Sequence, residues 1–306
     1  MEPVSDLQRV MDSGKFAVTA EIGPPKHANA EVIKKHADVL KGHVEAANLT
    51  DNQTAIVRMS SIAAGALCVN YGVEPVIQMV CRDRNRIAIQ SDLLGAYALG
   101  CRNLLCLSGD HQQFGNHPDS KNVFDVDSIQ LLYMLKTMIK DKKFQCGDEI
   151  KSDFDMFIGA AANPFGDPFE FRVTRLKKKI EAGAQFIQTQ CVFDIERFKK
   201  YMDGVVAAGL DKKVHIMAGV TPMKSDKGFK YIKKYVAGMS VPDEMIARIA
   251  AVEDKKEEGV KIAVETINEI KKIKGVHGVH IMAIGWESIV PRIIEETGLK
   301  VRPDYS

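Results

Sequence analysis

The sequence predicts a (β/α)8 barrel, in which eight parallel strands alternate with helices that cover the outside of the sheet. Eight short apolar runs, each about the length of a buried strand, recur along the 306-residue chain. Longer segments with helical spacing of apolar residues separate these runs. Eight is also the number of strands that closes such a barrel. An open, doubly wound sheet is the alternative, but no GxGxxG motif follows any early run.

The predicted strands are the apolar runs at 16–22, 44–50, 74–80, 102–108, 154–161, 185–190, 214–219 and 278–284. In the first strand, Ala17, Thr19 and Glu21 share one face because side chains alternate along a strand. We expect this face to point into the barrel, with Glu21 at its mouth. Gly23 and the two prolines after it would end the strand.

Helices are predicted where apolar residues recur three and four apart, at 55–70, 127–140, 169–182 and 260–273. The first would bury the stripe Ile56, Met59, Ala63 and Leu67. Asp127 or Ser128 suits the N-cap of the second, and Gly183 suits the end of the third. The long segment 221–259 predicts two additional helices after strand seven. No linker rich in Gly, Ser or Pro is present, so residues 1–306 are expected to form one domain.

Charge and cysteine content exclude several classes of protein. A net charge of +2 gives no electrostatic argument for binding nucleic acid or a membrane surface. The N-terminus has no apolar signal-peptide core, and no apolar run reaches the roughly 18 residues of a membrane span. None of the six cysteines forms a CxxC pair, so we expect reduced thiols in a cytoplasmic protein without a metal site. His277 and His280 lie three apart and would point to opposite faces of a strand.

The functional site of such a barrel lies at the carboxyl ends of its strands, where this chain is rich in uncharged polar residues. The polar residues there are Glu21, Thr50, Asp51, Asn52, Gln78, Ser108, Gly109, Asp110, Asn163, Asp167, Gln188, Thr189 and Gln190. Amides and hydroxyls both donate and accept hydrogen bonds, which suits the edges of a heteroaromatic ligand better than a bare metal ion.

Two carboxylates in this set are candidates for catalysis. A buried carboxyl group with a raised pKa can serve as a general acid near neutral pH. For Glu21 the alternative is an ordinary ion pair with a lysine or arginine. Asp110 follows Gly109 and would equally suit a turn, and Gln190 would suit a core amide. The basic run 172–183 is either a solvated helix face or, through Arg172 and Arg175 in its first turn, a phosphate site.

Several motifs resemble those of the methylenetetrahydrofolate reductase family. "TAEIGPPK" is similar to the family's first strand, and "LCLSGD" to its fourth strand, which ends in Gly-Asp. "EAGAQFIQTQCVFD" and "AGVTPM" resemble its sixth strand and the loop after its seventh, and "GLKVRP" resembles its C-terminal ending. The motifs occur in order along nearly the whole chain.

The resemblance implies a flavin-containing barrel that reduces 5,10-methylenetetrahydrofolate to 5-methyltetrahydrofolate. It assigns Glu21 as the acid that protonates N10 of the folate, Asp110 as an aspartate near flavin and pterin, and Gln190 as a folate-binding residue. The flavin-binding positions that it implies are Thr50, Gln78, Ser108, Gly109, Asp110, Asn163, Asp167, Arg175, Lys178 and Lys179.

The chain departs from the family's pattern at several flavin-contacting positions. Ser108 stands where the family often has Arg, Gln78 replaces a His, and Asn163 replaces a Tyr. A further His of the family is replaced near Asp167. The flavin is therefore FAD or FMN, and the electron donor is NAD(P)H or a partner subunit.

The expected assembly is a homo-oligomer or a complex with a redox or accessory subunit. Two alternatives remain open: a flavin-free, pterin-binding barrel of the methyltransferase type, and an accessory barrel subunit of a larger redox complex.

Overall fold

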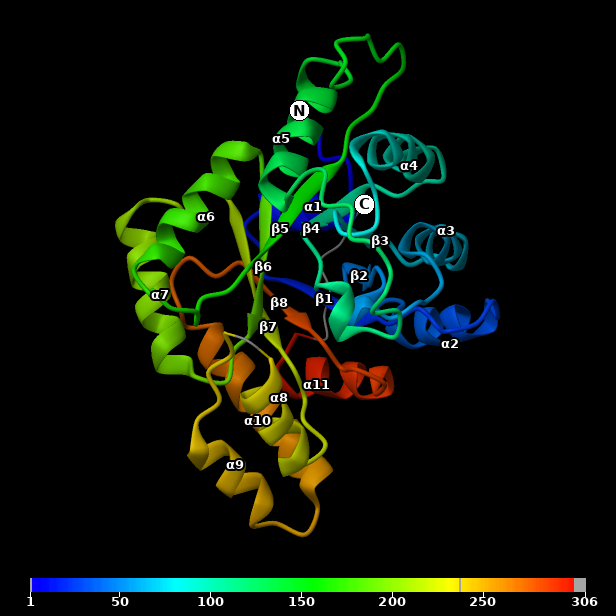
Figure 1. Ribbon diagram of the computed structural model, residues 1–306. Coiled ribbons are helices and arrows are strands. Elements are labelled where there is room, and N and C mark those ends of the chain that lie inside the picture. Colours follow the sequence, from blue (N-terminus) through cyan, green and yellow to red (C-terminus); the bar gives the residue numbers. More distant parts are fainter. Residues whose placement is uncertain (1, 237, 300–306) are drawn as a thin grey trace.

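The computed structural model describes residues 2–236 and 238–299, and its eight strands close into a barrel (Figure 1). Each strand pairs in parallel with the next, and β8 pairs with β1. The strands are β1 Ala17–Ile22, β2 Ala46–Leu49, β3 Pro75–Val80, β4 Asn103–Leu107, β5 Phe157–Ala162, β6 Phe186–Cys191, β7 His215–Val220 and β8 Gly278–Ile281. The predicted fold class is confirmed.

Helices surround the sheet (Figure 1). They are α1 Asp6–Asp12, α2 Glu31–Leu40, α3 Ser61–Tyr71, α4 Arg86–Ala98, α5 Ser128–Lys140, α6 Phe171–Ala182, α7 Ile195–Ala207, α8 Asp226–Tyr235, α9 Asp243–Ala250, α10 Lys255–Ile270 and α11 Val290–Glu296. Three 3-10 turns lie in the loops: η1 Gln53–Ala55, η2 Gln112–Phe114 and η3 Glu287–Ile289. The two helices predicted after strand seven are α8 and α9.

The predicted helix ends agree with the structure at two places and fail at a third. Asp127 caps α5 in a capping box with Gln130, and Gly183 ends α6. The helix predicted at 55–70, however, begins only at Ser61, because Ala55 has a positive φ and Met59 N–H donates to the Pro25 carbonyl.

The predicted stripe on this helix was consequently wrong in part. Ile56 and Met59 precede α3, and Ala63 is exposed, whereas Leu67 lies on the helix and packs against the core as predicted. The helix instead buries Ser61, Ala64, Gly65 and Cys68. Gly65 is required there because a Cβ would lie 2.7 Å from an Ile77 methyl group on β3.

The end of the barrel interior where the strands begin is filled with apolar side chains. Inward side chains of the strands form one cluster with Leu7, Val10 and Met11 of α1, which lies across this end. Phe157 and Phe186 stack there with centroids 4.8 Å apart. Gly159 provides the space, since a Cβ would lie 2.3 Å from the Phe186 ring. Side chains therefore fill this end of the interior, and the cavity among the strand ends opens at the opposite end.

The outer faces of the strands form the main core against the helices. Val18, Ala20 and Ile22 of β1 belong to this core, whereas Ala17, Thr19 and Glu21 face the interior. The predicted alternation of β1 is confirmed. No helix in the described part of the chain is long and apolar enough to cross a membrane. Residues 300–303 of the "GLKVRP" motif lie outside the described residues.

Candidate active site

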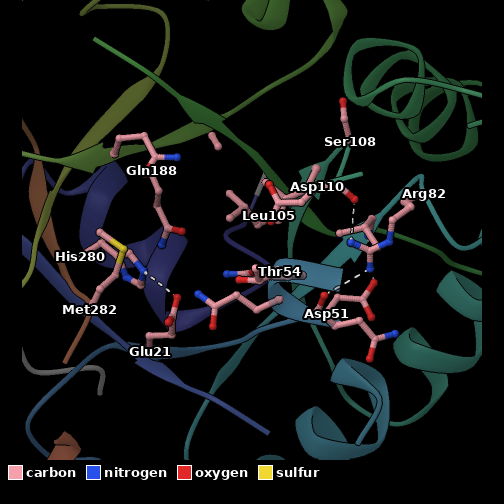
Figure 2. Close-up of a pocket in the computed structure, with 18 of the residues that line it drawn as sticks. Glu21, Asp51, Thr54, Arg82, Leu105, Ser108, Asp110, Gln188, His280 and Met282 are labelled. Atoms are coloured by element: carbon pink, nitrogen blue, oxygen red, sulfur yellow. Dashed lines mark hydrogen bonds and ion pairs between the residues drawn. The ribbon is translucent and has the colours of Figure 1, made fainter. Parts of the chain in front are cut away.

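A cavity of about 320 Å³ opens at the carboxyl ends of the strands. Residues of β1, β3, β4, β5, β6 and β8 line it, together with the loops after β2, β3 and β4. Glu21 and His280 lie on one side, and Arg82 and Asp110 lie on the other (Figure 2). The cavity thus sits where a (β/α)8 barrel carries its functional site.

Glu21 is a buried acid on the inner wall of this cavity, with 7% of its surface exposed. Burial raises the pKa of its carboxyl group to about 7, and the nearby charge of Glu287 acts in the same direction. A hydrogen bond with Gln53 and the charge of Arg58 partly oppose this increase. No ion pair with lysine or arginine involves Glu21 within the described ranges. Its carboxyl group can therefore hold a proton near neutral pH.

His280 faces Glu21 from β8, with Nε2 4.0 Å from a carboxyl oxygen. Burial lowers the pKa of its ring to about 3, so the imidazole is neutral. Its Nδ1 lies 2.9 Å from the Thr19 hydroxyl, which accepts a hydrogen bond from Gln188. The Thr19 hydroxyl also lies 3.9 Å from the Met217 sulfur, and these contacts hold the ring with Nε2 towards Glu21.

This contact is part of a buried polar layer that crosses the barrel below the cavity. The side-chain amides of Asn48 and Gln188 exchange two hydrogen bonds, at 2.6 and 3.1 Å, and Gln188 continues the chain to Thr19. Hydrogen-bonded networks of this kind hold buried side chains in one orientation. The layer therefore fixes the floor beneath Glu21.

The opposite wall is built from the ends of β3 and β4. Arg82 is buried, and it donates to the backbone carbonyls of Asp110 and Asn52 (Figure 2). Gly109 has a φ of +89°, and a Cβ there would lie 3.0 Å from the Val80 side chain. Arg82 thus ties the loop that carries Asp110 to the loop after β2.

The loop after β2 is held by a buried ion pair. Asp51 accepts hydrogen bonds from Arg84 at 2.7 and 3.3 Å, and from the Val80 backbone N–H. Asn52 and Thr54 beyond it have φ of 44° and 57°, which is uncommon for residues with a side chain. Such strain persists where the surrounding structure enforces it, often at functional sites.

A second cavity of about 160 Å³, the α6 cavity, adjoins the first, and Ala161 and Gln190 line both. Arg172, Arg175 and Lys179 of α6 line it on one side. Burial, followed by repulsion from Arg175, lowers the pKa of Lys179 to about 8. A phosphate or another anion would relieve that repulsion.

The structure brings most of the predicted site residues together. Those in the main cavity are Glu21, Gln78, Ser108, Gly109, Asp110 and Gln190, and those in the α6 cavity are Asn163, Arg175, Lys179 and again Gln190. Gln190 is exposed, so it is not the core amide of the alternative interpretation.

Three predicted flavin-binding residues line neither cavity. Thr50 is buried below the surface, and its hydroxyl has no hydrogen-bond partner among the described residues. Asp167 is exposed and pairs with Arg197 at 2.9 Å. Lys178 projects from another side of α6 than Lys179, and its ammonium lies 5.9 Å from the Phe171 ring centre.

Sequence reasoning missed His280, Arg82 and Gln53 as site residues. His280 belongs to the inward-facing positions of β8, and the strand period alone could have placed it there. Arg82 follows β3 directly, so its position at a strand end was also visible. Gln53 offered no signal, because the conformation of its loop depends on Asp51 and on contacts with distant residues.

The fold and the site define a (β/α)8-barrel protein with a protonatable acid inside a polar cavity and a cationic cavity beside it. A family model described as methylenetetrahydrofolate reductase matches residues 6–298. The chain therefore belongs to the methylenetetrahydrofolate reductase family, as the sequence motifs indicated.

Individual members of the family share about a quarter of the aligned residues with this chain. Methylenetetrahydrofolate reductase 1 of Schizosaccharomyces pombe is 26% identical over 238 residues, covering 75% of this chain and 36% of the relative. The 5,10-methylenetetrahydrofolate reductase of Pectobacterium carotovorum is 26% identical over 209 residues, covering 66% and 62%. The chain thus spans from about a third to about three fifths of the length of these relatives.

A solved structure from Clostridium thermocellum shares the fold. It superposes with a TM-score of 0.66 at 16% identity, covering 96% of this chain and 99% of that one. That protein is described as uncharacterized and as binding two copies of 5-methyl-5,6,7,8-tetrahydrofolic acid.

Proposed function

We propose that the protein reduces 5,10-methylenetetrahydrofolate to 5-methyltetrahydrofolate with a bound flavin, and that Glu21 is its general acid. One observation carries this proposal: in a member of this family, a carboxyl group with a pKa of about 7 lines the central cavity. The folate ligand described for the Clostridium thermocellum structure supports a folate as substrate.

Protonation is the step that the chain itself would perform. Opening the five-membered ring of the substrate expels N10 as an amine, which is a poor leaving group unless it gains a proton. Glu21 would donate that proton, and the negative charge of Asp110 would favour the cationic iminium form of the substrate. Gln190, at the open side of the cavity, would bind the folate. A bound flavin would supply the hydride for the methylene carbon.

The donor set of the two cavities fits a flavin nucleotide. Arg172, Arg175 and Lys179 would hold its phosphate, because cationic side chains and anionic oxygens form strong charge-assisted hydrogen bonds. The amide of Gln78 and the backbone around Gly109 lie in the adjoining main cavity, where a ring system would lie. The cofactor is FAD or FMN, and the donor is NAD(P)H or a partner subunit.

The flavin-free alternative has one observation in its favour. The ligand described for the Clostridium thermocellum structure is a reduced folate, bound in two copies. The purified protein's visible spectrum distinguishes the two functions: the flavin proposal predicts absorbance near 450 nm that bleaches on anaerobic reduction, whereas a pterin-binding methyltransferase would show none.

The assignment of Glu21 is tested with Glu21→Gln. The variant should bind flavin and accept electrons normally, yet lose at least 100-fold in the rate at which reduced enzyme converts methylenetetrahydrofolate. In the parent protein, this rate should fall about fivefold between pH 7 and pH 8, because the protonated fraction of an acid with a pKa of about 7 falls from about one half to about one eleventh. A variant that reduces the substrate at a near-parental rate would refute the assignment.

A further inference from the structure

A separate cavity of about 230 Å³, the rear cavity, lies behind Glu21. Glu21 and Gln53 line both this cavity and the main one, so the acid stands between the two spaces. Arg58, His36 and Glu287 also line the rear cavity. The space is polar and exceeds the roughly 30 Å³ that a water molecule occupies in the liquid.

His36 and Glu287 form a titratable pair between this cavity and the surface. His36 lies on α2, and Glu287 is the first residue of η3, after β8. His36 Nδ1 lies 3.4 Å from a carboxyl oxygen of Glu287. The exposed side-chain fraction falls from 26% at His36 to 10% at Glu287 and 8% at Glu21, so the three groups lead from solvent to the acid.

We propose that the rear cavity is the proton-supply route of Glu21, with His36 and Glu287 as its relay residues. The inference rests on the proposed role of Glu21. After Glu21 has given its proton to the substrate nitrogen, its carboxylate takes one from water in the rear cavity. Glu287 replaces that proton, His36 protonates Glu287, and His36 takes a proton from the solvent. The net change is one proton moved inward, and no other reactant is consumed.

The main cavity is poorly suited to this supply. Substrate and cofactor would fill it during turnover and exclude water from the front of Glu21. His280 cannot serve as the source, because burial lowers the pKa of its ring to about 3 and its Nδ1 is engaged by Thr19. The Cys191 thiol is near enough to feel the charge of Glu21, but burial raises the pKa of this thiol to about 11.

The remaining neighbours of Glu21, Gln53 and Arg58, are compatible with proton transfer through the rear cavity. Gln53 hydrogen-bonds to the carboxyl group, and a side-chain amide can both donate and accept. Arg58 is anchored to the Pro24 carbonyl and contributes positive charge that stabilises the carboxylate between turnovers.

The test compares the first turnover with continuous turnover in His36→Ala and Glu287→Gln. Flavin is pre-reduced with dithionite for single turnovers and supplied with reduced methyl viologen for steady-state turnover, both at pH 6, where an acid with a pKa of about 7 is mostly protonated. We expect each variant to convert the first methylenetetrahydrofolate within about twofold of the parental rate, since Glu21 then already holds its proton. Steady-state turnover should fall at least tenfold, and free imidazole should restore much of it in His36→Ala.

Lys35→Ala, which removes an exposed side chain next to His36 on α2, is the matched control and should match the parent in both assays. Unchanged steady-state turnover in both variants would overturn the relay. Equal loss in both assays without imidazole rescue would also overturn it, leaving the pair a packing contact between α2 and η3. Failure of the proposed function can be distinguished from failure of the relay. If Glu21 were not the acid, Glu21→Gln would retain the parental rate of the first turnover.

Discussion

Replacing Glu21 with glutamine should stabilise the folded protein at alkaline pH while removing its chemistry. In the folded state the carboxyl pKa is raised from 4.5 to about 7, mainly by burial. Between these values the folded protein binds more protons at this site than the unfolded chain does, so its stability falls as pH rises. A glutamine of similar shape carries no such dependence.

The magnitude follows from the two pKa values. Relative to a group whose pKa does not change on folding, Glu21 lowers the free energy of unfolding by about 1 kcal/mol at pH 5 and by about 3 kcal/mol at pH 8. At pH 8 the carboxyl group is largely ionised in both the folded and the unfolded state. The free energy of unfolding of Glu21→Gln, relative to the parent protein, should therefore increase by about 2 kcal/mol between pH 5 and pH 8.

Urea denaturation at both pH values, followed by circular dichroism, measures this difference. Glu31→Gln on α2, where the side chain is exposed, controls for the loss of one negative charge. A difference between Glu21→Gln and the parent that stays constant from pH 5 to pH 8 would show that the carboxyl group is not perturbed by burial, and the argument for a neutral-pH acid would fail with it.

Two further predictions concern the loops that shape the main cavity. Arg84→Met should lower the free energy of unfolding by about 3 kcal/mol, because it leaves Asp51 buried without its ion-pair partner; Asp51→Asn combined with Arg84→Met should recover part of the loss in the same urea titration. Gly109→Ala should lower the melting temperature by several degrees, because its φ of +89° disfavours a side chain and the new methyl group would press on Val80; an unchanged melting temperature would contradict this.

The barrel and the inward position of Glu21 were predictable because they depend on local periodicity. A period of two along β1 determines which side chains face the interior, and the count of apolar runs determines how the sheet closes. Arg175 was singled out by its place in the basic run 172–183, and Lys179 was among the positions implied by the family resemblance. Their shared cavity with Asn163 agrees with that assignment, whereas Lys178 shows that adjacent residues on a helix point in different directions.

The rear cavity was not predictable in the same way. Its lining comes from α2, from the loop after β2 and from η3, which are distant in sequence. His36 lies on the surface side of an amphipathic helix, where a histidine gives no functional signal. Glu287 follows β8, which ends at Ile281 rather than at residue 284 as predicted, and its place against β1 and α2 depends on the conformation of the loop between them.

The proline pair after Glu21 has a role beyond ending the strand. Proline has no backbone N–H, so Pro24 and Pro25 can only accept hydrogen bonds through their carbonyl groups. Both do so from the loop after β2: Pro24 accepts from the Arg58 side chain at 3.1 Å, and Pro25 accepts from the Met59 backbone at 2.8 Å. The same loop carries Gln53 and Arg58 to the acid. The segment that follows the carboxylate therefore anchors Arg58, one of the two residues that oppose the increase in the pKa of Glu21.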